Sequence, residues 1–90
     1  MILKKPYKTT DEFYTAVEEL IASLRSDGHE SDAQRLDIIL HGVWTTGSEL
    51  IGELMLCLAD INLKLPKGLQ NLKNNCYYFA THHRKILALD

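Results

Sequence analysis

Two cysteines and four histidines are the side chains of this chain best suited to bind a metal ion or to attack a substrate. Cys57 and Cys76 lie far apart and match neither the CxxC nor the HxxxH spacing of zinc sites. His82 and His83 are adjacent, and neighbouring residues of a helix point about 100° apart, so this pair cannot chelate one ion. The sequence therefore predicts no metal site.

The same cysteines make poor candidates for a catalytic nucleophile. A reactive thiol needs a base close to it, and neither Cys57 nor Cys76 has one beside it in sequence. If the helices that carry them form a hairpin, Cys76 lies about one turn past the point opposite Cys57, so a disulfide is strained although not impossible. We expect two small core residues with free thiols, which fit a reducing compartment.

Three carboxylates, Glu49, Glu53 and Asp60, share roughly one side of a predicted helix. Paired carboxylates can bind a metal or move protons, but helical di-metal sites need Glu-x-x-His on more than one helix, and no histidine follows Glu49 or Glu53 at that distance. We expect a narrow solvated stripe with Leu56 between the charges. No GxGxxG, P-loop, HExxH or GxSxG motif occurs, so the sequence predicts neither an enzyme nor a bound cofactor.

The stretch from Tyr77 to Lys85 combines aromatic and basic residues. Such residues stack on nucleic-acid bases, anchor protein interfaces, or form a helix with one buried and one wetted side. The last interpretation is favoured, then a protein interface. Nucleic acid ranks third, because no exposed basic helix follows a short turn as in a helix-turn-helix. The candidate interface residues are Trp44, Met55, Tyr77, Tyr78, His82 and Arg84.

Composition and charge indicate one globular domain. The 90 residues are 46% apolar and 24% charged, which argues against disorder. Residues 1–61 carry five basic against eleven acidic residues, a net charge of −6, whereas residues 62–90 carry five against one, a net charge of +4. This asymmetry is typical of a nucleic-acid-binding tail or of two parts of one fold that attract each other, and the dispersed positive charges favour the second.

Neither a signal peptide nor a membrane span is expected. No apolar segment follows the lysines near the N-terminus, and polar residues interrupt the apolar run over 50–65. We therefore expect a cytoplasmic protein that does not bind membranes.

Hydrophobic periodicity predicts four helices after an N-terminal extension over residues 1–8, and these helices cover about 10–27, 31–41, 48–62 and 66–87. Thr9 and Thr46 each precede a glutamate by three residues, which is the capping-box spacing, and Ser48 is a rival cap. Gly28 is a natural stop for the first helix, so the first two helices should form a tight hairpin.

The predicted fold is all-α, a compact antiparallel four-helix up-down bundle in a single domain. The helix over 48–62 is apolar around most of its circumference, so either three neighbouring helices surround it or part of it meets another chain. A chain of this size buries only about 60–65% of its unfolded surface. Self-association as a homodimer is therefore expected.

The leading functional hypothesis is a non-enzymatic protein-interaction module, such as an adaptor, an antitoxin-like or an immunity-like protein, whose partner is a protein or a second copy. The first alternative is a nucleic-acid-associated regulator that uses Lys64, Lys67, Lys73, Arg84 and Lys85. The second is a small-ligand or metal-binding protein with a pocket near Trp44, Gly52 and His83.

Overall fold

The computed structural model describes residues 7–61 and 64–88, and it places the side chains of residues 7–61 and 64–82. This part of the chain is all-helical, and the helices are α1 (Thr10–Ser26), α2 (Glu30–Leu40), α3 (Gly47–Asp60) and α4 (Lys67–Ala88). Each begins and ends close to the limits predicted from the sequence. Residues 1–6 of the predicted extension lie outside the described part.

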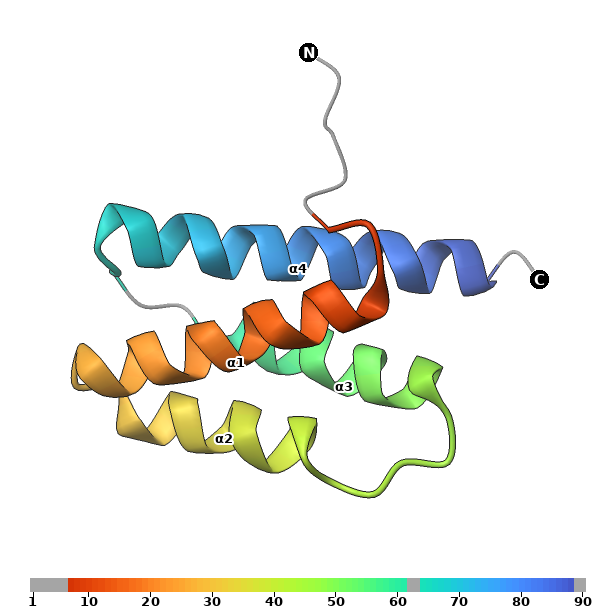
Figure 1. The fold of residues 1–90 in the computed structure, drawn as a ribbon, viewed down its shortest axis with the longest axis horizontal. Coiled ribbons are helices and arrows are strands. Elements are labelled where there is room, and N and C mark those ends of the chain that lie inside the picture. The colour runs from red at the N-terminus through yellow and green to blue at the C-terminus, as the bar shows by residue number, and fades with distance from the viewer. Residues whose placement is uncertain (1–6, 62–63, 89–90) are drawn as a thin grey trace, which may run out of the picture.

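The helices form an antiparallel up-down bundle (Figure 1). Each helix packs against its neighbours in sequence, and α1 also packs against α4, which closes the ring. The diagonal pairs, α1 with α3 and α2 with α4, are separated by the core. The all-α four-helix bundle predicted from the sequence is thus confirmed, with α3 paired to two helices and not three.

Two threonines start α1 and α3, as the capping-box spacing predicts. Thr9 Oγ1 accepts a hydrogen bond from the Glu12 amide at 3.1 Å, and Thr46 Oγ1 accepts one from the Glu49 amide at 3.2 Å. These bonds satisfy amides that no helical carbonyl can reach. Ser48, the rival cap, lies inside α3.

The turn between α1 and α2 depends on Gly28, whose φ of +86° lies in the left-handed region. The Gly28 amide donates to the Arg25 carbonyl at 3.1 Å, and the His29 amide donates to the Leu24 carbonyl at 2.7 Å. These bonds satisfy the free carbonyls at the end of α1. The predicted tight αα-hairpin is present.

We expect Gly28→Ala to lower the free energy of unfolding by about 1–2 kcal/mol, because a Cβ atom is strained at positive φ even where space is open. Urea unfolding followed by circular dichroism measures this loss. Gly68→Ala is the matched control, since a Cβ at Gly68 also meets nothing within 4 Å and the φ of Gly68 is not positive. Equal stability of the two variants would contradict the prediction.

Candidate functional site

The six candidate interface residues do not form one cluster. Met55 is half-buried on α3, and Tyr77 is exposed on the neighbouring helix α4. Tyr78 and His82 stack on each other one helical turn apart on α4, with ring centres 6.1 Å apart and planes 7° from parallel. Trp44 lies in the connection between α2 and α3, and the side chain of Arg84 lies outside the described part.

Tyr77 lines a shallow hollow of about 310 Å³ between α3 and α4, together with Leu58, Ala59, Lys73 and Asn74. Tyr77 keeps 40% of its surface exposed. We call this surface the α3–α4 face and define it by Met55, Ala59, Asn74 and Tyr77. It combines residues of the two segments that stand out in the sequence. These are the helix that is apolar around most of its circumference and the stretch that begins at Tyr77.

Lys73 does not offer its charge to the α3–α4 face. Its Nζ donates to the Ile61 carbonyl at 3.0 Å, at the C-terminal end of α3. A cation there satisfies a free carbonyl and complements the negative end of the helix dipole. Lys73 therefore holds α4 against α3.

Over residues 70–82, the outward side of α4 is almost free of formal charge. Between residues 70 and 82 the only charged residue is Lys73, and the exposed or half-exposed polar residues are amides, tyrosines, a threonine and a histidine. Gln70 Nε2 donates to Asn74 Oδ1 at 3.1 Å, and Tyr78 and His82 stack on each other one turn further along the helix. These side chains are Gln70, Asn71, Asn74, Asn75, Tyr77, Tyr78, Thr81 and His82.

The acidic stripe predicted on α3 is exposed, and Leu56 lies within it. Asp60 Oδ2 accepts from Arg35 Nη2 of α2 at 3.2 Å, whereas Glu49 and Glu53 have no ion pair among the described residues. No metal site is apparent there, since the described residues contain no group of three His, Cys, Asp or Glu side chains placed to hold an ion.

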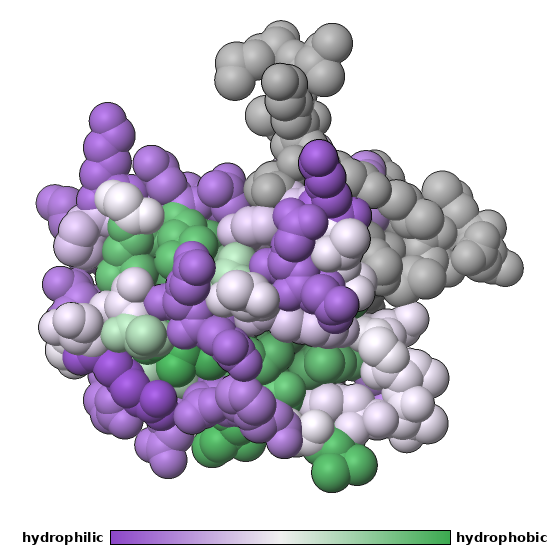
Figure 2. All heavy atoms as spheres, viewed as in Figure 1, coloured by the Kyte–Doolittle hydropathy of each residue, from purple (hydrophilic) through white to green (hydrophobic). Residues whose placement is uncertain are grey.

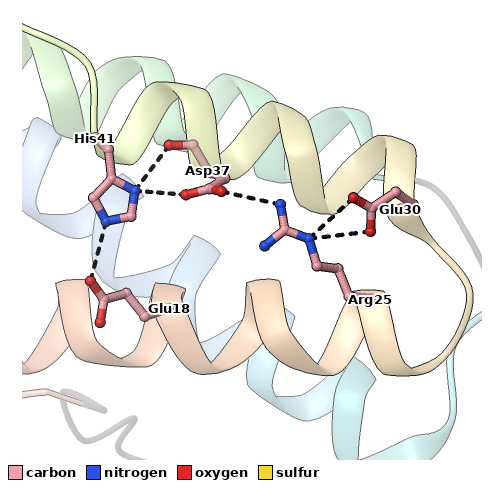
Figure 3. A network of polar contacts seen from close by, with 5 residues as sticks. All are labelled: Glu18, Arg25, Glu30, Asp37 and His41. Carbon is pink, nitrogen blue, oxygen red and sulfur yellow. Dashed lines mark hydrogen bonds and ion pairs between the residues drawn. The ribbon is translucent and has the colours of Figure 1, made fainter.

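A polar network joins α1 to α2 (Figure 3). Arg25 donates to Glu30 at 3.2 Å and to Asp37 at 3.1 Å. His41 Nδ1 lies 2.7 Å from Asp37 Oδ1, and its Nε2 lies 3.4 Å from Glu18 Oε1. The hydrogen bond to the Asp37 carboxylate, followed by those to the Asp37 carbonyl and to Glu18, raises the pKa of His41 above its ordinary value of 6.5. Arg25 first, and then His41, lower the pKa of Asp37.

These pKa shifts predict how stability depends on pH. A raised pKa means that the folded state binds the His41 proton more tightly, so this contribution is complete below about pH 6.5 and is lost as pH rises through the folded pKa. The Asp37 contribution is present above about pH 4 and is lost as pH falls. The melting temperature of the wild type should therefore fall relative to that of His41→Gln between pH 6 and pH 9. If the melting temperatures of the two proteins change with pH in parallel, the protonation of His41 contributes nothing to stability.

Both cysteines are buried free thiols, as expected from the sequence. Burial raises the pKa of Cys57, and burial raises the pKa of Cys76 to about 11. Cys76 Sγ lies 3.8 Å from the Tyr7 hydroxyl, which is not a base at neutral pH. A thiol held neutral is a weak nucleophile, so this geometry does not favour thiol chemistry.

Trp44 has a structural contact that the sequence did not predict. Its Nε1 donates to the Ile39 carbonyl at 2.7 Å, and a Cβ added to Gly42 would lie 3.2 Å from this nitrogen. The indole thus lies against Gly42 and satisfies a carbonyl in the last turn of α2. The proposed pocket near Trp44, Gly52 and His83 is not tested, because the His83 side chain lies outside the described part.

A second hollow, of about 350 Å³, was missed in the sequence. Its walls come from one side of α1 and from Tyr7. Two apolar contacts hold Tyr7 there, since its ring lies 5.8 Å from Phe79 and 6.3 Å from Phe13. The sequence signal that could have indicated this hollow is the spacing of three or four residues between its lining positions on α1. The lining residues are Tyr7, Asp11, Glu12, Thr15, Ala16 and Glu19.

No protein-family model matches the chain, and no curated protein or solved structure is detectably similar to it. Within the described residues, no helix combines the length and apolar character needed to cross a membrane. The case for a function therefore rests on the geometry of the described side chains.

Proposed function

We propose that this chain is a non-enzymatic protein-interaction module whose contact surface is the α3–α4 face with the outward side of α4. The observation that carries the proposal is the exposed Tyr77, which borders an open hollow on a helix side that is nearly free of charge. Tyrosine is enriched in protein interfaces, while lysine, glutamate and aspartate are depleted from their centres.

The rest of the described surface differs from this one in character. The outward sides of α1 and α2 carry many charges, and Figure 2 shows hydrophilic side chains over much of one face of the molecule. On the α4 side, a hydrogen bond joins Gln70 to Asn74 and a ring stack joins Tyr78 to His82. Side chains that already contact each other lose less conformational entropy on binding, which favours affinity.

A nucleic-acid-associated regulator is the second candidate. Lys64 and Lys67 are exposed and have no ion pair among the described residues. The uncharged centre of α4 and the inward-turned Lys73 count against it, because nucleic-acid affinity comes mainly from cations placed on phosphates. Steep salt dependence of binding to DNA or RNA would favour this candidate over the first.

A capture experiment tests the proposal. The immobilised chain is exposed to a lysate of its native host, and each retained protein is then purified and titrated against the wild type. We expect a partner whose affinity drops at least tenfold with Tyr77→Asp and is unchanged with Ile38→Asp, since Ile38 is 65% exposed on α2, away from the α3–α4 face. If no protein, including the chain itself, shows this dependence, the proposal is wrong.

A further inference from the structure

Exposed large apolar side chains are concentrated on α2, on α3 and on the connection between these helices. Ile38 of α2 is 65% exposed, Val43 of the connection is fully exposed, and Leu56 of α3 is 51% exposed. Among the described residues, the fourth side chain of this kind is Tyr77, on α4. Figure 2 shows hydrophobic side chains along the edge of the molecule that α2 and the connection form. Single exposed apolar residues are ordinary, whereas several gathered in one place indicate a contact surface.

The ion pair between Arg35 and Asp60 shows how α2 and α3 lie against each other. Arg35 Nη2 lies 3.2 Å from Asp60 Oδ2, so these residues are at about the same level of the two antiparallel helices. Ile38 follows Arg35 by three residues and therefore shares a side of α2 with it. Leu56 precedes Asp60 by four residues and shares a side of α3 with it. Ile38 and Leu56 are thus level with each other on neighbouring helices, whose axes pack about 8–10 Å apart, so one further helix can contact both side chains.

The charge around these two side chains is negative. Arg35 is the only lysine or arginine of α2 and α3, and these helices contain six acidic residues. Asp32 lies one turn before Arg35 on α2, and Glu53 lies two turns before Asp60, on the side of α3 nearer α2. Neither Asp32 nor Glu53 has an ion pair among the described residues, whereas Asp60 and Arg35 neutralise each other. We call this surface the α2–α3 face and define it by Asp32, Arg35, Ile38, Glu53, Leu56 and Asp60.

We infer that the α2–α3 face binds a basic amphipathic helix of another protein. The apolar side of that helix covers Ile38 and Leu56, and its lysines or arginines lie beside Asp32 and Glu53. Binding through one apolar side is a common way for a protein to recognise a helix. A helix that packs against two others already occurs in this bundle, where α4 contacts both α1 and α3. The inference goes beyond the proposed function and does not rest on it, because the α2–α3 and α3–α4 faces share no residue.

The sign of the charge favours this partner over the alternatives. A second copy bound about a twofold axis would use the same patch on both chains, so the carboxylates of one copy would meet those of the other. Like charges brought together in an interface oppose binding. Nucleic acids and anionic membranes carry the same sign of charge as the α2–α3 face and are repelled for the same reason. A basic helix gains both from charge attraction and from removing two exposed apolar side chains from water.

Selection from a displayed library of helix-favouring peptides tests the inference, with the purified full chain as the target. Peptides of about 18 residues form a helix of about 27 Å, which is long enough to cover the face. The library is first depleted on the double variant Ile38→Gln with Leu56→Gln and is then selected on the wild type. Glutamine is an uncharged residue that favours helices, so this variant removes the apolar contact and leaves the charge of the face unchanged. We expect the enriched peptides to carry apolar residues at helical spacing, flanked by lysine or arginine.

Titration of an enriched synthetic peptide then measures each contribution. The double variant Ile38→Gln with Leu56→Gln should raise the dissociation constant at least about tenfold while the circular dichroism spectrum of the chain stays unchanged. Glu53→Lys should raise it at least about threefold, and a peptide with glutamate in place of one flanking lysine or arginine should bind this variant more tightly than the original peptide does. Tyr77→Gln, the control on the α3–α4 face, should leave the dissociation constant unchanged.

Four results would overturn the inference: no enriched peptide, enriched peptides without a net positive charge, a dissociation constant that the double variant leaves unchanged, or self-association that the double variant abolishes. The last, measured by sedimentation velocity, would assign the face to a second copy of the chain. The proposed function would stand in each case, because its own test depends on Tyr77 and not on Ile38 or Leu56. Loss of the Tyr77 dependence in the capture experiment would in turn leave this inference untouched.

Discussion

Phe13→Ala should cost this protein about 3–5 kcal/mol of unfolding free energy, since it removes a fully buried ring and leaves a cavity. The ring stacks on Phe79 with centres 4.8 Å apart and planes at 22°, and it lies 5.6 Å from the ring of Tyr14. It thus joins α1 to α4, and it also contacts Tyr7 in the segment before α1. A domain of this size has a total stability of about 5–13 kcal/mol, so the variant should lose a large share of it.

Urea unfolding monitored by circular dichroism measures the Phe13→Ala effect. Thr15→Ala, at an exposed position of the same helix, should change stability by less than about 0.5 kcal/mol. A loss below 1 kcal/mol for Phe13→Ala would show that the aromatic cluster does not hold α1 and α4 together.

Leu36→Ala should lower the free energy of unfolding by about 3–4 kcal/mol. Helix α2 has eleven residues, and only Ala33 and Leu36 of them are buried. Its N-cap residue, His29, makes no side-chain hydrogen bond to the helix. Truncating Leu36 removes the main apolar anchor of α2, and the exposed ion pairs to Arg25 cannot replace it, because such pairs contribute little.

Hydrogen exchange locates the effect of Leu36→Ala. Amides of α2 should exchange faster than those of α1 and α4, because α2 can open while the Phe13–Phe79 contact persists. Ile38→Ala is the matched control: Ile38 is 65% exposed on the same helix, and its removal should leave both stability and exchange nearly unchanged. If amide exchange became faster by the same factor in all helices, α2 would not open separately from the rest of the bundle.

The sequence alone determined the helices and their ends, because both depend on residues close together in the chain. Thr9 and Thr46 cap helices through amides three residues away, and Gly28 takes the positive φ that a tight turn needs. The apolar spacing also identified the buried side of α1, where Phe13, Val17, Leu20, Ile21 and Leu24 are all in the core. These interactions need no knowledge of the rest of the fold.

Only the tertiary structure decided which apolar and aromatic residues stay exposed. Leu56 and Leu58 belong to one apolar run, but Leu58 is fully buried and Leu56 is half exposed, because α3 pairs with two helices. Tyr77 and Tyr78 are adjacent in sequence, and only Tyr77 lines the hollow against α3. The contact of Tyr7 with Cys76 joins residues 69 apart, and such a contact depends on the packing of α1 against α4 and not on local spacing.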